Sequence, residues 1–559
     1  MEMEKNEPLN LPACAEQFLA EVVRRMRCRK RVREEVRQEL VAHFEDELRD
    51  CADVPEREQR AQRLIEEFGD AKLLAVLCRR AKKRCQPLWA KMLVHGLQAI
   101  GVWILLLSLY MVWFFSGKPN VRVDYLAILS QKAQPRAGEQ ENAWPHYERA
   151  IELLVQEPNE LGEVEAFRYY VSAGARDLSG FTDPERRALE DWLVANRPAW
   201  EEFAAGVTKP YCWRQYEPGA GGARGPSLLN VDMAGYAQLR RFAFLGIWRS
   251  RVHFHHGRVS DALEDCLIVA RAGSHWQRLP LLMEQLLGHG LSSMAHAEIL
   301  RLIERRTPSP EALATLQRGL SELYPQQYPL ADIEERWLTA LDVVQHEFTD
   351  GGPGGGHLVY SFSDIVESAR VSMGLRSAKW LQLPDWKRMF LHPRRNQAVA
   401  KAREMFERQR RLVRLTPYER RNREVAVAEE TSDSLPEYGD VLVNSDVFWE
   451  ESIVTRNAFH SKAMHEATLT IVALLRHRQE KGLYPASLEE LIGSGYLQAL
   501  PCDPYGSGAL SYRRGNSDFV LYSLGPDFDD DGGILGETEE GRIPNWLNHG
   551  DTVFWPVIP

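Results

Sequence analysis

The chain has 559 residues, of which 44% are hydrophobic and 26% charged, and its mean hydropathy is −0.37. A chain of this length needs more than one folded unit, and the composition is that of a globular chain rather than a disordered one. The formal net charge is −10 and the isoelectric point about 6.0, so the bulk charge gives no reason to expect nucleic acid as a partner.

The first 91 residues carry three apolar stripes with helical spacing. The stripes are Val32, Val36, Leu40, Phe44 and Leu48; Ala61, Leu64, Ile65 and Phe68; and Leu73, Leu74 and Leu77. Gly69 suits the position just past the second helix, and Asp70 can cap the third. Three amphipathic helices can bury a small common core, so residues 1–91 are predicted to form a helical domain.

Two short motifs in this head resemble a known domain. The string ELVAHFED, from Glu39 to Asp46, and the later Phe68-Gly69-Asp70 are similar to the small helical domain called HAAS. In bacteria that domain often precedes a membrane span and is linked to transcriptional control, so the resemblance implies a protein partner for the head. Val54-Pro55-Glu56 stands where the domain usually has a glycine. The alternative is a generic helical cap on a membrane anchor.

One segment is apolar enough to cross a bilayer. Residues 92–115 read MLVHGLQAIGVWILLLSLYMVWFF and contain no Asp, Glu, Lys or Arg. About 20 apolar residues span the hydrocarbon core, and the aromatic residues at the far end are typical of a membrane interface. We therefore expect a transmembrane helix over 92–115, with a buried core helix as the alternative.

The flanking charges predict the orientation of this span. The basic residues before it are Arg79, Arg80, Lys82, Lys83, Arg84 and Lys91, whereas Lys118 and Arg122 follow it. Positive charge stays inside, so the head is expected in the cytoplasm of a bacterium, with the span in its cytoplasmic (inner) membrane and the C-terminal bulk exported. Met1–Leu11 does not resemble a cleavable signal, so the span is expected to stay as an anchor. Five of the eight cysteines precede the span, which agrees with a reducing cytoplasm.

Residues 118–459 are predicted to form an exported helical-hairpin domain. Asp183-Pro184-Glu185 and Ser309-Pro310-Glu311 each indicate an N-cap, a proline and an acidic first turn. Gly257–Ser260 separates two further helices, and that unit and Trp144–Ala150 resemble tetratricopeptide-like hairpins, although no 34-residue period recurs. Six residues share one face of another helix: Met283, Leu286, Leu287, Gly290, Met294 and Ala297.

Two groups of residues in this region have the composition of possible sites. His253 and His256 share a helix face, but no acidic or thiol ligand precedes them at helical spacing, so a solvated helix end is favoured over a metal site. The second group is an aromatic patch of Trp200, Tyr211, Trp213 and Tyr216. For this patch, packing in the core is favoured over the lining of a ligand groove. Neither a nucleophile elbow nor a phosphate-binding loop is found, so no catalytic residue is predicted.

Residues 460–559 indicate a small α+β domain. Met464, Ala467 and Ile471 mark a helix that ends before Gly482, and Ser487 with Glu490 has capping-box spacing. Two strand-like runs follow, Leu510–Arg513 and Phe519–Ser523, with Gly515-Asn516 as the turn between them.

This order of elements resembles the globular domain of the type II secretion major pseudopilins, from about residue 463 to 546. The motifs are Gly482-Leu483-Tyr484-Pro485, Leu500-Pro501, Asp503-Pro504-Tyr505-Gly506, Ser523-Leu524-Gly525, Asp527, Gly532-Gly533 and Asn545-Trp546. That family binds calcium in its C-terminal loop, which implies Asp527 and the backbone carbonyl of Ser523 as ligands. Arg542 stands where the family has a second aspartate. A pseudopilin begins with its hydrophobic helix, whereas this span is internal, so assembly into a pilus is not expected.

The loop also carries calcium-like chemistry of its own. Asp527-x-Asp529-x-Asp531-Gly532 has the spacing of the first half of an EF-hand loop, although Thr538 occupies the twelfth position, next to Glu537. A structural calcium ion (Ca2+) is predicted, with Ser523, Asp527, Asp529, Asp531 and Glu537 as ligands; the alternative is a solvated acidic loop.

The sequence thus predicts a mainly α single-pass membrane protein with a cytoplasmic helical head, a large exported helical domain and a small α+β pseudopilin-like tail. The expected function is binding, scaffolding or signalling. The alternatives are an accessory protein of secretion machinery, or an enzyme, such as a hydrolase, with an unrecognised site in the helical domain.

Overall fold

The computed structural model groups the chain into two compact units, Met1–Trp113 and Phe114–Pro559. It describes residues 11–51, 53–84, 88–135, 138–158, 178, 181–219, 227–233, 235–359, 394–428, 453–536, 546 and 549–557. Within these residues the chain is mainly helical, as the apolar periodicity predicts.

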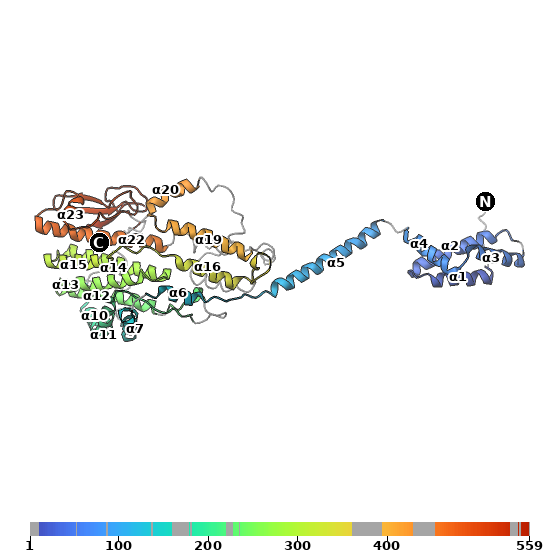
Figure 1. Ribbon diagram of the computed structural model, residues 1–559, viewed down its shortest axis with the longest axis horizontal. Coiled ribbons are helices and arrows are strands. Elements are labelled where there is room, and N and C mark those ends of the chain that lie inside the picture. The colour runs from blue at the N-terminus through green and yellow to red at the C-terminus, as the bar shows by residue number, and fades with distance from the viewer. Residues whose placement is uncertain are drawn as a thin grey trace. The chain divides into compact units, whose positions relative to one another are not determined.

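The N-terminal unit consists of α1 (Ala13–Arg25), α2 (Lys30–Leu48), α3 (Val54–Phe68), α4 (Ala71–Arg84) and α5 (Leu88–Phe115) (Figure 1). The first of these helices was not predicted, but it supplies Leu19 to the same small core as Phe44 and Leu64. Gly69 ends α3 at a φ of 68°, in the left-handed region that favours glycine, which confirms the predicted stop.

The third predicted stripe is only partly buried. Leu74 packs against the core of the unit, whereas Leu73 and Leu77 are 60% and 52% exposed. The core side of α4 is formed instead by small residues, Ala71, Ala75 and Cys78, which let the helix lie close to α1. The prediction was therefore wrong for Leu73 and Leu77, because spacing alone does not tell which side of a helix faces a neighbour.

The segment Met92–Phe115 of α5 is long and apolar enough to cross a membrane. It has 24 residues, a mean hydropathy of 2.0, and only 6% of its most apolar window is buried inside the structure. It is one such helix among the residues that the structure describes. A core helix of this length would be covered by neighbours, so the exposure favours a membrane helix over the alternative.

The C-terminal unit is a stack of helices with a small sheet at one side. Its helices are α6 (Tyr125–Ala133), α7 (Trp144–Leu153), α10 (Asp183–Ala195), α11 (Arg197–Val207), α12 (Tyr236–His255), α13 (Val259–Trp276), α14 (Leu282–Arg305), α15 (Pro310–Glu322), α16 (Glu334–Glu347), α19 (Arg395–Leu412), α20 (Pro417–Ala428), α22 (Ile453–Lys481) and α23 (Glu489–Gly493), with short 3-10 turns at Glu139–Glu141, Leu228–Asn230 and Pro353–Gly355. In Figure 1 they form layers that run from α7, α10 and α11 through α12, α13 and α14 to α22, and the sheet lies beyond α22.

Two of the predicted helix starts in this unit have side-chain caps. Ser309 accepts a hydrogen bond from the backbone N–H of Ala312 at 3.2 Å, as predicted. At α10 the cap is Thr182 rather than Asp183, because Thr182 and Glu185 form a reciprocal capping box. The capping box predicted for Ser487 and Glu490 is wrong, since α23 starts after Leu488 without a side-chain cap.

The sheet has the strand order β1-β2-β3 and is antiparallel throughout. β1 (Ser511–Arg514) and β2 (Phe519–Ser523) form the predicted hairpin, and Gly515 donates to the carbonyl of Asp518 at 2.7 Å in the turn. β3 (Thr552–Trp555) was not predicted, because all four of its residues are buried and the strand shows no alternation of apolar and polar residues.

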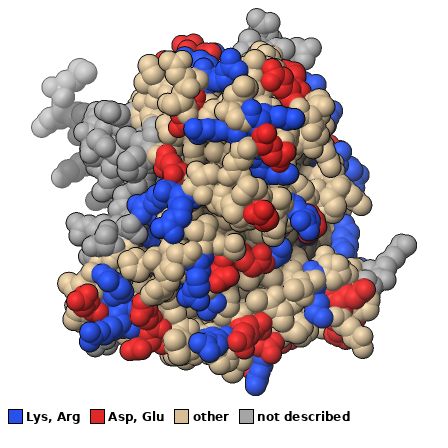
Figure 2. Space-filling model, turned by 90° about the vertical axis from the view of Figure 1, so that its left-hand side faces the viewer, with Lys and Arg blue, Asp and Glu red and all other residues tan. Residues whose placement is uncertain are grey.

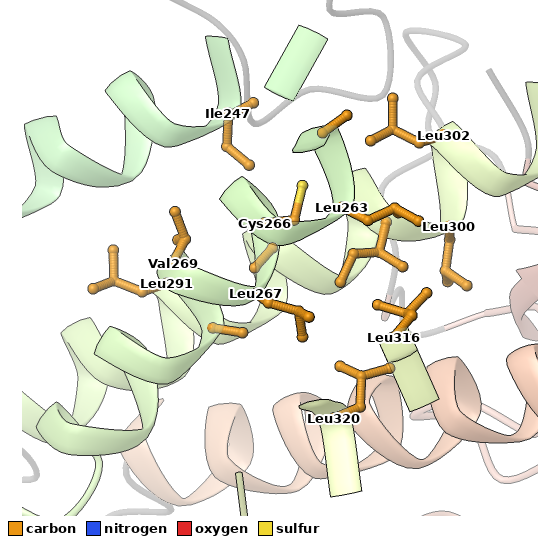
Figure 3. Packing of buried hydrophobic residues seen from close by; sticks show 14 of the residues in the cluster. Ile247, Leu263, Cys266, Leu267, Val269, Leu291, Leu300, Leu302, Leu316 and Leu320 are labelled. Atoms are coloured by element: carbon orange, nitrogen blue, oxygen red, sulfur yellow. The ribbon is translucent and has the colours of Figure 1, made fainter. Parts of the chain in front are cut away.

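The largest hydrophobic core in the described part of the C-terminal unit joins its central helices to the sheet, and three smaller clusters lie apart from it. Figure 3 shows side chains from α12, α13, α14 and α15 that point toward one another, among them Ile247, Cys266, Leu291 and Leu316. The same core continues through α22 to Phe554 and Trp555 on β3. The boundary predicted between residues 459 and 460 lies within α22, which packs on α14 and α15 and also on the sheet.

The apolar face predicted on α14 is the more exposed one. Met283 is 50% exposed, and Gly290 and Ala297 are also exposed. The buried side of α14 instead carries polar residues, which we call the polar seam: Glu284, Gln285, His289, Ser292, His296 and Glu298. A polar side chain is buried at low cost only when it is hydrogen-bonded, so the partners of the seam decide how the unit is assembled.

Two glycines let α13 and α14 approach closely. A Cβ added at Gly288 would lie 2.4 Å from the backbone nitrogen of Gln277 and 2.7 Å from the carbonyl oxygen of Gly273. A Cβ at Gly273 would lie 2.8 Å from the carbonyl oxygen of Gly288. These contacts are with backbone, so the helices themselves would have to move apart.

We expect Gly288→Ala to lower the free energy of unfolding by about 1–3 kcal/mol, because the added methyl overpacks a helix contact. Gly290→Ala is the matched control on the same helix, since nothing lies within 4 Å of a Cβ there. That change should stabilise by about 0.5–1 kcal/mol through helix propensity. Denaturant unfolding of both variants tests this, and equal effects would contradict the close contact.

Candidate functional site

The acidic loop that follows β2 is held by its own carboxylates. Asp527 accepts from the backbone N–H of Gly550 at 2.6 Å and from that of Asp529 at 3.3 Å. Asp530 accepts from the hydroxyl of Tyr522 at 2.9 Å and from the N–H of Gly532 at 3.0 Å. The loop is therefore folded against the sheet through hydrogen bonds.

The predicted metal ligands differ in exposure. Asp527 is half-buried, whereas Asp529 and Asp531 are exposed. Ser523 is fully buried, and its hydroxyl donates to Asp503 at 2.6 Å. Glu537 lies outside the described residues, as do Arg542 and Asn545 of the pseudopilin-like motifs.

Asp503 ties the loop to the segment that precedes the hairpin. It is 1% exposed and accepts from the backbone N–H of Tyr505 at 2.9 Å and of Leu524 at 3.0 Å, besides the hydroxyl of Ser523. Burial raises the pKa of this carboxyl, and the hydrogen bonds oppose the rise. The Asp503-Pro504-Tyr505-Gly506 motif thus fixes the end of β2, from which the acidic loop starts.

Asp551 is a candidate residue that the sequence analysis missed. It is 2% exposed, and its Oδ2 accepts from the backbone N–H of Gly533 at 2.5 Å. Its Oδ1 has no hydrogen-bond partner among the described residues. Burial is the main reason that the pKa of Asp551 rises to about 6, and Asp530 adds to it. Asp551 directly precedes β3, so no sequence signal marked it once that strand was missed.

The described carboxylates do not by themselves form a metal centre. Across the described ranges, no group of three His, Cys, Asp or Glu side chains is arranged to hold a metal ion. The alternate spacing of Asp527, Asp529 and Asp531 therefore does not bring the three side chains together in this structure, because their oxygens bond to loop amides or face solvent. Calcium binding stays a prediction.

A second polar group surrounds Glu284 in the polar seam. Glu284 is fully buried and accepts from the Nε of Arg214 at 3.2 Å and from the hydroxyls of Tyr216 and Tyr236, each at 2.7 Å. Arg214 also lies 5.2 Å from the centre of the Trp144 ring. The charges of Arg214 and Glu284 are thus both paired inside the unit, as expected for a buried ion pair that orients neighbouring segments.

The polar seam continues as a histidine cluster between α14 and α22. His296 Nε2 lies 3.2 Å from His465 Nδ1, and His289 stacks on Tyr328 at 6.1 Å between ring centres. Tyr328 donates to Ser461 at 2.6 Å. Burial lowers the pKa of His289 and of His296 to about 3, so both rings are neutral at pH 7.

The histidine pair and the aromatic patch named from the sequence each have separate partners in the structure. His253 Nδ1 lies 2.9 Å from Asp265, and His256 Nε2 lies 3.5 Å from Glu190. Trp200 is buried in the main core, and the Nε1 of Trp213 donates to the carbonyl of Ser130. The aromatic patch therefore serves packing and hydrogen bonding rather than lining one groove.

Glu347, at the end of α16, is a second acid that the sequence did not single out. It is 3% exposed, and its Oε2 has no partner among the residues that the structure describes. Burial raises its pKa well above the ordinary value. A neutral carboxylic acid here could donate a proton, but no nucleophile or base is placed beside it by the contacts of the described residues.

Comparison of the chain with family models, with curated proteins and with solved structures finds no match. The resemblances to the HAAS domain, to tetratricopeptide-like hairpins and to the pseudopilin domain therefore stay predictions from the motifs.

We expect His289→Phe to make stability less dependent on pH. The folded pKa of His289, about 3, lies below the unfolded value of about 6.5. The contribution of His289 to the free energy of unfolding is therefore fully present above pH 6.5. It falls by about 1.4 kcal/mol per pH unit as the pH drops toward 3, because the unfolded chain binds the proton first. Phenylalanine keeps the ring contact with Tyr328 and removes the proton.

The measurement is denaturant unfolding of both proteins at pH 7.5 and at pH 5.5. The difference between variant and wild type should grow as the pH falls. Phenylalanine in place of the exposed His255 is the control and should follow the wild type. Parallel pH curves for His289→Phe and wild type would contradict the assignment.

Proposed function

We propose that this chain is a single-pass protein of the bacterial cytoplasmic membrane. The part of its N-terminal unit that precedes α5 lies in the cytoplasm, α5 crosses the membrane, and the C-terminal unit lies on the outer side. It acts by binding, scaffolding or signalling rather than by catalysis, with the head as the part that meets a cytoplasmic protein partner.

The observation that carries the proposal is the exposed apolar helix Met92–Phe115. Most of its apolar side chains are exposed in the described structure, and exposing so much apolar surface to water would be very unfavourable. Six basic residues from Arg79 to Lys91 precede it and two follow, which supports a cytoplasmic N-terminus.

The packing of the C-terminal unit supports a scaffold. The buried ion pairs Arg214–Glu284 and Arg251–Glu298 lie within the unit, and His296 and His465 lie within hydrogen-bond distance of each other. Figure 2 shows Lys and Arg interspersed with Asp and Glu over one face of this unit, as on an ordinary solvated surface. Rigid interior networks and a mixed surface suit a binding platform.

The tail supports a relation to the pseudopilin domain. Long α22, short α23 and an antiparallel sheet follow one another in the order that the resemblance implies. We further propose that this tail docks against another exported or membrane protein.

Native cysteines provide a test of the orientation. Cys502 is exposed in the C-terminal unit, Cys212 and Cys266 are buried, and Cys14 and Cys51 lie in the N-terminal unit. We expect a membrane-impermeant maleimide to label the full chain in intact spheroplasts at Cys502, and Cys502→Ser to abolish that labelling. Lysis should then expose the N-terminal thiols. Labelling that persists in Cys502→Ser spheroplasts would reverse the proposed orientation.

We also propose that calcium stabilises the acidic loop. The ligands would be Asp527, Asp529, Asp531, Glu537 and the Ser523 carbonyl, with Asp551 added because its buried Oδ1 has no partner among the described residues. These are oxygen donors, which Ca2+ requires. The cation would neutralise the carboxylate of Asp551, whose pKa is raised mainly by burial and further by the charge of Asp530.

Thermal unfolding of the full chain with calcium and with a chelator tests this. An ion that binds only the folded state adds about 2.7 kcal/mol at a concentration 100-fold above its Kd. We expect a higher Tm with calcium, and loss of the shift in Asp551→Asn and Asp529→Asn. Glu322→Gln, an exposed change on α15, should keep the shift. An unchanged Tm of the wild type would contradict calcium binding and would favour the alternative, a solvated acidic loop.

A further inference from the structure

The outer side of α4 exposes an apolar stripe. Leu73 is 60% exposed, Val76 41% and Leu77 52%, and the spacing i, i+3, i+4 places them on one face. The opposite side, with Ala75 at 2% exposure, packs into the core of the unit. The stripe is therefore not needed for folding of the N-terminal unit and faces away from its core.

The charge of α4 is of one sign. Its sequence AKLLAVLCRRAKKR contains six basic residues and no acidic residue. Lys82 is paired with Glu35 and Glu39 on α2, whereas the exposed Lys72, Arg79 and Arg80 form no ion pair with any described side chain. An exposed apolar stripe with free basic residues beside it is the pattern of a helix that lies in a membrane interface.

The end of α4 lies close to the membrane helix along the chain. α4 ends at Arg84 and α5 begins at Leu88, so the two ends are at most about 14 Å apart even with the backbone fully extended. The apolar span itself begins at Met92. If α5 crosses the bilayer, the last turn of α4 is therefore within reach of the lipid headgroups.

We propose that α4 lies on the cytoplasmic membrane surface and binds its anionic lipids. Leu73, Val76 and Leu77 enter the boundary between headgroups and acyl chains, and the free basic residues contact lipid phosphates. The inference rests on the proposed membrane anchoring. It adds that the head is held against the bilayer by a second contact besides α5.

The charge pattern favours lipid over a second copy of this chain. Pairing two α4 stripes would bring the basic residues of both copies together, and like charges on opposed surfaces repel. Anionic phosphates instead compensate them, at about fivefold in affinity for each basic residue near the surface. Membrane lipid is thus the occupant that satisfies both the stripe and its charge.

Site-specific photocrosslinking of the full chain tests the proposal. p-Benzoylphenylalanine would be placed at Leu77, at Leu105 in α5 and at Asp46 on α2 as a control in the same unit. Each protein is reconstituted in nanodiscs of phosphatidylcholine with or without phosphatidylglycerol, and adducts are identified by intact mass. We expect lipid adducts at Leu105 in both lipids, at Leu77 mainly with the anionic lipid, and none at Asp46.

Charge variants test whether the unpaired basic residues of α4 contribute to lipid binding. Arg79→Gln with Arg80→Gln should lower the lipid adduct at Leu77 by about fivefold per charge in anionic discs and leave that at Leu105 unchanged. Lys82→Gln is the matched control, because that residue is occupied by Glu35 and Glu39. A smaller loss of the Leu77 lipid adduct in Lys82→Gln than in the double arginine variant supports a role for the unpaired charges of Arg79 and Arg80.

The failures are distinguishable. Lipid adducts at Leu105 together with protein dimers, or with no adduct, at Leu77 would overturn this inference and leave the anchoring intact. No lipid adduct at Leu105 would overturn the anchoring and the inference with it.

Discussion

The burial of a polar helix face is the constraint on which the C-terminal unit depends. Once Glu284 is removed from water, its charge must be met by Arg214 and by two tyrosine hydroxyls. These partners come from segments before α14 in the chain, and His465 comes from α22 far after it. The need to pair these buried polar groups thus determines which elements surround α14, whereas apolar packing alone would be compatible with many arrangements.

Much of the local structure could be predicted from the sequence. The apolar run of α5, the Ser309 cap and the glycine that ends α3 are signalled by residues within one or two turns. The β1–β2 hairpin was found for the same reason, since its turn and both strands are contiguous. Local chemistry decides these features, so a single sequence carries them.

What the sequence did not reveal depends on distant partners. Periodicity selected the Met283 face of α14, because a polar residue such as His289 is read as solvent-facing unless its neighbours are known. Asp551 was missed because its burial follows from β3, which exists only through pairing with β2. The loop carboxylates were expected to converge, but Asp527 is engaged by Gly550, which lies 23 positions further along the chain. The HAAS, tetratricopeptide and pseudopilin resemblances rest on motifs and stay predictions.

The continuous core has a consequence for biosynthesis. Tyr147 on α7 and Trp555 on β3 belong to one core although they are roughly 400 residues apart, a separation that slows folding. β3 is synthesised after α22, so the apolar side of α22 that packs on β3 stays uncovered until β3 has been made. The C-terminal unit would therefore need a chaperone to shield the apolar side of α22 until β3 has joined the core.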